Sequence, residues 1–217
     1  RQATRNANDG TALVQTAEGG LNEITNILVR LRELTVQAAS DTVGDNERAL
    51  LNTEFQSLTT EVDRISDATT FNGTSLLNGK SGRGTLEFHV GAFTGEQNKI
   101  KFDADATNAS ADSIGIASLN VASRDDANDA IPGLDLAIGN VSTLRASLGA
   151  IQSRLQSTVS NLEIQTINQD SARSVIQDVD VAQSTANLAS TSVVKAAGIA
   201  TLMQANNIPT AALRLIG

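Results

Sequence analysis

A small or apolar residue recurs every three or four positions through the first forty residues of this chain. The members of this stripe are Ala7, Gly10, Val14, Ala17, Leu21, Ile24, Leu28, Leu31, Thr35 and Ala38. Alternating steps of three and four place these residues on one face of an α-helix, as in a coiled coil. The pattern therefore predicts one long helix over residues 1 to about 40, whose apolar face is buried against another helix. Gly10, Gly19 and Gly20 each cost up to about 1 kcal/mol against Ala, which indicates a neighbouring helix that approaches closely.

Two further stretches carry the same kind of stripe. One predicts a helix over about 45–68, with Leu51, Phe55, Leu58, Val62 and Ile65 on its apolar face. The other predicts a helix over about 129–172, with Leu134, Ala137, Val141, Leu144, Leu148, Ile151, Leu155, Thr158 and Leu162. Because stripes of similar length can bury one another, we expect a mainly α fold, an elongated antiparallel helical bundle resembling a coiled-coil rod. Pro132 indicates either that the third helix begins near Asp129 or that it is kinked at the proline.

Residues 69–122 have a different pattern, rich in turn-forming residues. Two alternating runs, Thr85–Val90 and Asn98–Phe102, are joined by the sequence GAFTGEQN. Alternation with a period of two predicts two strands, and the glycines between them predict a β-hairpin. On the first strand His89 shares a face with Glu87, opposite Leu86 and Phe88, so we expect this histidine to be solvated.

The last segment, residues 181–217, is apolar and contains no carboxylate. We expect it to form an amphipathic helix ending near Pro209, with no partner elsewhere in the sequence. The residues that would be buried by another polypeptide are Leu188, Val193, Val194, Ile199, Leu202, Met203, Ile208, Leu213, Leu215 and Ile216, together with Val181 at the start. We therefore predict that a second chain covers residues 185–217.

Groups that support catalysis are scarce in this sequence. It has no Cys and a single His, which excludes a disulfide framework and a thiolate metal site. The sequence NGKSGRG lacks the first glycine of a phosphate-binding loop, since Thr74 stands in its place, and is read as a surface turn. The acidic pairs Asp125–Asp126 and Asp178–Asp180 are read as helix-end residues rather than cation ligands. We expect no enzyme activity, no cofactor and no metal.

Charge and hydropathy exclude further classes of partner. The net charge of −8 disfavours nucleic acid and anionic membrane surfaces. No apolar run approaches the roughly 20 residues of a membrane span. On the first helix, Arg30, Leu34 and Gln37 are spaced to share a face away from the buried stripe. Leu34 is therefore expected to be exposed beside Arg30, as part of a possible partner surface.

Several segments resemble bacterial flagellin, in the order and spacing of that family. They are RNANDGTALVQTAEGGLNEI, RLRELTVQAAS, FNGTSLLNG, LGAIQSRLQSTVSNL and QANNIPTAALRLIG. The chain resembles a compact flagellin without a large variable outer domain and truncated at its N-terminus. The resemblance implies that residues 1–180 form the rod-shaped core domain and residues 181–217 the C-terminal half of the inner-tube domain. It also implies a secreted subunit of the extracellular flagellum, polymerised through its terminal helices for motility.

The resemblance further implies partners. These are other flagellin subunits in a helical homopolymer, a flagellin export chaperone on residues 185–217, and the filament cap and hook-associated proteins. A flagellin-sensing Toll-like receptor is expected to bind monomers through Arg30, Leu34 and Glu54. The alternatives are a hook–filament junction protein or a needle-like secretion-system subunit. The segments LGAIQSRLQ and FNGTSLLNG favour flagellin, because those relatives generally diverge there.

Overall fold

The computed structural model describes the backbone of residues 1–177 and 180–216, and side chains as far as residue 208. Inter-residue contacts divide the chain into two units, Arg1–Thr166 and Ile167–Gly217. The first unit holds the long helices α1 (Gln2–Ala38) and α2 (Asp45–Ala68), most of α3 (Arg124–Gln177), and the β region between α2 and α3. The second unit holds the end of α3 and the helix α4 (Val181–Ile216). These elements confirm the predicted mainly α fold.

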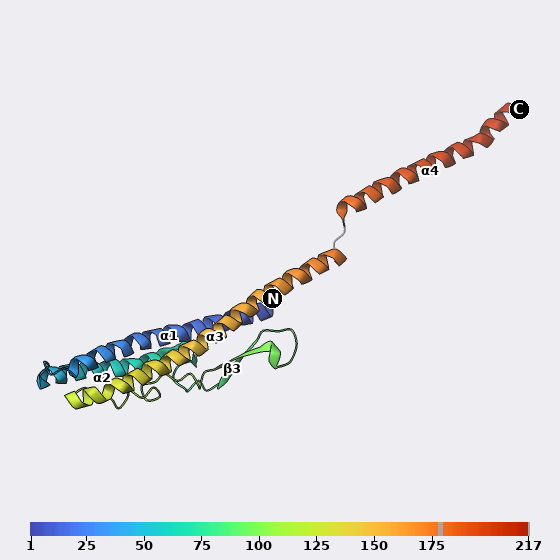
Figure 1. The fold of residues 1–217 in the computed structure, drawn as a ribbon. Coiled ribbons are helices and arrows are strands. Elements are labelled where there is room, and N and C mark those ends of the chain that lie inside the picture. Colours follow the sequence, from blue (N-terminus) through green and yellow to red (C-terminus); the bar gives the residue numbers. More distant parts are fainter. Residues whose placement is uncertain (178–179, 217) are drawn as a thin grey trace. The chain divides into compact units, whose positions relative to one another are not determined.

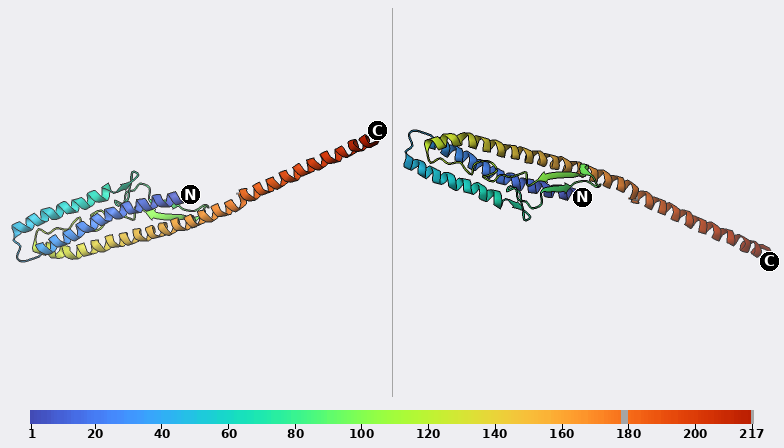
Figure 2. Two further views of the ribbon diagram at one scale, coloured as in Figure 1. Left: turned by 90° about the horizontal axis from the view of Figure 1, so that it is seen from above. Right: turned by 90° about the horizontal axis from the view of Figure 1, so that it is seen from below.

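The three helices of the first unit lie side by side (Figures 1 and 2). Two ion pairs show the relative direction of α1 and α3. Arg32 of α1 contacts Asp135 of α3 at 2.7 Å, and Asp41, just after α1, contacts Arg124 at the start of α3 at 2.8 Å. Residue numbers rise along α1 as they fall along α3, so these two helices are antiparallel. The first unit is thus the antiparallel bundle that the stripes predict.

The predicted stripe of α1 is the centre of the hydrophobic core. All ten of its members are buried, and the structure adds Leu13 and Leu34 to the buried face. From α2, Phe55 and Val62 are buried, and from α3, Leu134, Val141 and Leu155. Each helix therefore hides the apolar face of the others, which removes these side chains from water at about 25 cal/mol per Å².

The β region consists of two short antiparallel pairs. Strands β1 (Thr70–Phe71) and β2 (Thr74–Ser75) are joined by Asn72 and Gly73, whose φ angles of 49° and 74° match a type I′ turn. Strands β3 (Thr85–His89) and β4 (Lys99–Asp103) form the predicted hairpin. Its connection contains the short 3₁₀ helix η1 (Glu96–Asn98). Residues of β3 alternate in exposure. His89 is exposed, as predicted, on the same face as Glu87.

Two glycines of α1 allow the β region to approach the helix closely. A Cβ on Gly10 would lie 3.0 Å from the ring of Phe88 in β3, and one on Gly20 would lie 2.7 Å from Leu77. The predicted close neighbour was a helix, and this was wrong, because the β region occupies that space. A Cβ on Gly19 would meet no neighbouring side chain or segment within 4 Å, so close approach does not explain that glycine.

The third helix begins earlier than predicted, at Arg124 rather than near Asp129. Ser123 explains the early start, since its Oγ accepts the backbone N–H of Asp126 at 3.1 Å and donates to the Asp126 carboxylate at 2.6 Å. Acceptance of a first-turn N–H by a serine hydroxyl stabilises a helix N-terminus. Pro132 consequently lies inside the helix, in its third turn. The helix also continues to Gln177, beyond the predicted end at 172.

Helix α4 is capped by Asp180, whose carboxylate accepts the backbone N–H of Gln183 at 3.0 Å. The helix passes Pro209 and ends at Ile216, so the predicted end near Pro209 was wrong. The residues after the proline include Ala and Leu, which have high helix propensity.

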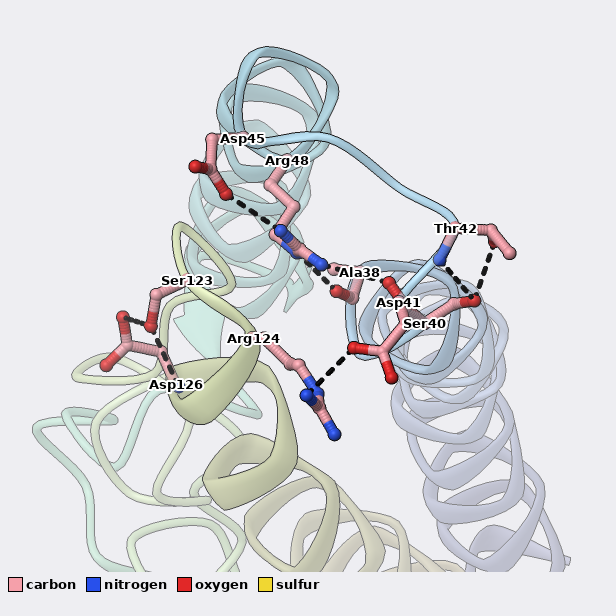
Figure 3. A network of polar contacts seen from close by, with 9 residues as sticks. All are labelled: Ala38, Ser40, Asp41, Thr42, Asp45, Arg48, Ser123, Arg124 and Asp126. Atoms are coloured by element: carbon pink, nitrogen blue, oxygen red, sulfur yellow. Dashed lines mark hydrogen bonds and ion pairs between the residues drawn. The ribbon is translucent and has the colours of Figure 1, made fainter.

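The connection between α1 and α2 is held by the buried side chain of Arg48 (Figure 3). Its Nε donates to the carbonyl of Ala38 at 2.8 Å and its Nη2 donates to the carbonyl of Ser40 at 2.9 Å. Its Nη1 donates to Asp45 at 2.8 Å. Backbone carbonyls at the end of a helix lack intrahelical partners, so Arg48 satisfies them and ties α2 to α1.

We expect Arg48→Ala to lower the free energy of unfolding of the first unit by about 2–4 kcal/mol, because it leaves buried carbonyls without charged donors. Urea titration followed by circular dichroism measures this loss. Arg64→Ala is the matched control, since Arg64 is exposed and pairs with Glu61 on its own helix. An equal shift of the unfolding midpoint in both variants would contradict the role given to Arg48.

Candidate functional site

Arg30 on α1 links two helices through a cluster of exposed charges. Its Nη2 and Nε both donate to Oε1 of Glu54 on α2, at 2.8 and 3.1 Å. Its Nη1 donates to Glu33, one turn along α1, at 3.3 Å. The side chains of Arg30 and Glu54 remain 49% and 45% exposed. The structure therefore brings together the two charged residues of the predicted recognition site in one accessible cluster.

The carboxylates alter the acid–base behaviour of this arginine. Hydrogen bonding to Glu54, and then to Glu33, raises the pKa of Arg30 above its ordinary value. Because the pair is exposed, it contributes little to stability.

Leu34 does not lie on this surface. Only 1% of its area is exposed, so the expectation of an exposed Leu34 was wrong. The apolar face of α1 is wider than a strict stripe, and Leu34 lies beside Leu31 and Thr35 at its edge. Leu34 can position Arg30 through the packing of the helix, but a partner could contact it only after a rearrangement.

The second candidate surface is the apolar side chains of α4. They are between 47% and 70% exposed within the chain, and comprise Val181, Leu188, Val193, Val194, Ile199, Leu202, Met203 and Ile208. The predicted contacts at Leu213, Leu215 and Ile216 lie outside the residues whose side chains are described. Large exposed apolar areas mark interaction sites, so α4 is the second candidate interaction surface.

The bulky residues of α4 surround the helix. At about 100° per residue, Leu188, Ile199, Leu202 and Met203 fall within a third of the circumference. Val193, Val194 and Ile208 fall on the opposite side. Because bulky apolar side chains lie on both sides of the helix, a single neighbour on one side would not cover all of them. The absence of carboxylates from residues 181–217 also removes like-charge repulsion when copies of the helix come together.

The sequence motifs considered above as possible chemical sites stabilise a turn and two helix ends. In NGKSGRG, the backbone N–H and the Oγ of Ser81 both donate to Oδ1 of Asp105, which holds a surface turn. Asp180 is the cap of α4, Asp126 is hydrogen-bonded to Ser123, the cap of α3, and Asp178 lies outside the described residues. Within residues 1–177 and 180–216, no group of three acidic or histidine side chains could hold a metal ion.

A helix that crosses a membrane must be both long and apolar. None of the helices in the described part of the chain satisfies both requirements.

Two family models match this chain. Residues 1–82 match the bacterial flagellin N-terminal helical region, and residues 131–216 match the bacterial flagellin C-terminal helical region. The two matches include α1, α2, nearly all of α3, and α4. Both candidate surfaces therefore lie within the matched regions.

Curated relatives agree with these matches. Flagellin of Halalkalibacterium halodurans is 40% identical over 99% of this chain and 78% of its own length. Flagellin of Bacillus subtilis is 35% identical over 99% of this chain and 80% of its own length. A flagellar filament core protein of Brachyspira hyodysenteriae is 35% identical over 100% of this chain and 79% of its own length.

Solved structures are similar in fold. The crystal structure of Bacillus cereus flagellin has a TM-score of 0.65 at 29% identity, covering 78% of this chain and 94% of that one. A putative flagellar hook-associated protein of Vibrio parahaemolyticus has a TM-score of 0.62 at 13% identity, covering 79% of this chain and 88% of its own. The latter likeness concerns the fold alone, so the sequence favours flagellin over a hook–filament junction protein.

We expect backbone amides of α4 in the monomer to exchange with solvent at least about a hundredfold faster than those of α1, because the side chains of α4 are exposed as far as residue 208. Hydrogen exchange with mass spectrometry measures both helices in one sample. Protection of α4 equal to that of α1 in a verified monomer would show that α4 is buried within the chain.

Proposed function

The chain belongs to the bacterial flagellin family, and from this membership we propose that it is a structural subunit of the flagellar filament. The family and its fold are structural rather than enzymatic. The observation that carries the proposal is α4, a helix of 36 residues whose apolar side chains are exposed in the isolated chain. Such a helix is explained if other subunits bury it.

Burial of α4 supplies the free energy of assembly in this proposal. Each Leu or Ile side chain contributes about 1.5–3 kcal/mol when fully removed from water. Several such contributions offset the conformational entropy lost when separate subunits become fixed. The first unit, Arg1–Thr166, has its own core and folds without this contribution, so it acts as the preformed body of the subunit.

The exposed apolar side chains of α4 also bear on how the subunit is exported. We propose that the subunit is secreted, assembles outside the cell and serves motility. Before assembly, an exposed apolar helix is an aggregation hazard, which a flagellin export chaperone bound to residues 185–217 would remove. In the filament, subunits at the two ends would contact the filament cap and hook-associated proteins.

We expect Leu202→Asp to abolish filament formation by the full-length protein, because it places a charge in the apolar interface of α4. Leu202→Ile is the matched control and should assemble normally. Sedimentation and negative-stain electron microscopy after seeding measure assembly, and circular dichroism checks that both monomers fold. Normal filaments from Leu202→Asp would remove α4 from the assembly interface.

We also propose that monomers are recognised by a flagellin-sensing Toll-like receptor through Arg30 and Glu54. The support is that these side chains form one exposed, hydrogen-bonded pair across two helices. Arginine is a frequent centre of binding energy in protein interfaces. Leu34 enters this proposal as a buried residue that positions Arg30, since it offers almost no surface to a partner.

We expect Arg30→Ala and Glu54→Gln each to raise the monomer concentration needed for half-maximal receptor signalling by about tenfold or more. A reporter-cell assay measures this shift. Arg64→Ala, which removes an exposed arginine elsewhere on α2, is the control and should signal normally. If all three variants matched the unmodified protein, the proposed recognition cluster would be wrong.

A further inference from the structure

One aromatic side chain is left exposed by the fold. Of the five Phe residues, all within the described part of the chain, Phe93 alone is largely exposed, at 77%. Phe55 and Phe102 are fully buried, and Phe71 and Phe88 pack partly against the core. Phe93 lies in the loop between β3 and β4, flanked by small residues in the sequence GAFTG. It is therefore a bulky apolar knob on an exposed hairpin.

A hollow of complementary character lies on α1. Its lining consists of Val29, Arg32, Glu33, Val36 and Gln37. Val29 and Val36 are 46% and 50% exposed, one heptad apart on the helix. Arg32 and Glu33 are held by Asp135 and Arg30, so their charges are already paired. The hollow offers an apolar surface whose two charged neighbours are already paired.

The knob and the hollow of one chain cannot meet. The hairpin lies at the end of the unit where α1 begins, since Asn6 donates to the carbonyl of His89 at 2.9 Å (Figures 1 and 2). Val36 is thirty residues further along α1, or about 45 Å at the rise of an α-helix. Phe93 could therefore reach such a hollow only on a second copy.

Charge favours this head-to-tail arrangement. The end of the unit that carries the α1–α2 turn and the start of α3 is acidic: residues 39–49 and 122–130 hold six carboxylates and two arginines. The opposite end, residues 1–8 and 85–103, holds four basic and three acidic residues. Two acidic ends would repel each other, whereas unlike ends would attract. A contact between different surfaces at opposite ends repeats without closing and gives a fibre.

We propose that Phe93 of one subunit inserts into the hollow of Val29 and Val36 on the next subunit. The proposal rests on the filament function proposed above, and it assigns a second, end-to-end contact in addition to burial of α4. One side chain and a shallow hollow form only a small part of a stable interface. Their role is to set the register of neighbouring subunits while α4 supplies most of the assembly free energy.

Because the chain has no cysteine, a designed pair tests the contact directly. The full-length variant Phe93→Cys/Val36→Cys is assembled, checked for filaments by electron microscopy, and treated with a short thiol-specific cross-linker. We expect a ladder of covalently joined subunits on denaturing gels. The control, Phe93→Cys/Ser142→Cys, places the second thiol at an exposed position in the middle of α3 and should give no ladder.

The possible outcomes separate the two proposals. Filaments of the first variant without a ladder, or an equal ladder in the control, would overturn the register contact and assign the hollow to another occupant. Absence of filaments from the unmodified protein would instead count against the filament function. If the double variant does not assemble, co-assembly of the two single-cysteine variants with unmodified protein must give cross-linked dimers, and their absence also overturns the contact.

Phe93→Ser should raise the critical concentration for assembly by about tenfold.

Discussion

The interlocking of three apolar stripes determines the structure of the first unit. The stripe of α1 is buried along its whole length because α2, α3 and the β region each cover part of it. The remaining features depend on this burial. The β region approaches α1 closely at Gly10 and Gly20, and Arg48 bonds to the carbonyl end of α1 across the α1–α2 turn. Burial of the stripes also brings Arg30 and Glu54 within hydrogen-bonding distance.

Periodicity was sufficient to predict the helices, the hairpin and ten buried residues of α1, since burial follows directly from position on a helix face. Interactions between distant segments were harder to predict. The burial of Leu34 depends on how far neighbouring elements extend around α1, and the partner of Gly10 depends on where β3 docks. The start of α3 could have been found from Ser123 and Asp126, which form a capping sequence. The Arg30–Glu54 bond required the register of two helices, which no local pattern contains.

The chain uses apolar residues in two different ways. In α1–α3 they form continuous stripes that are buried within the first unit, so this body is complete before any partner arrives. In α4 they lie on both sides of the helix and are exposed as far as residue 208, and the proposed function assigns their burial to other molecules. This division separates folding from assembly. The first unit of a subunit can be folded while the apolar side chains of its α4 are still exposed. The same division explains why a chaperone site and an assembly site are proposed on one segment.

The near absence of charge from α4 has a consequence for the dependence of the polymer on ionic strength. Lys195 and Arg214 are the only ionisable side chains between residues 181 and 217. Dissolved ions therefore have little effect through screening on the contacts made by this helix. They weaken the interactions between exposed charges at the ends of the first unit. Adhesion between subunits should persist in both fresh and saline water, while the alignment of neighbouring subunits responds to the medium. Cohesion and shape in the polymer would then be adjustable independently.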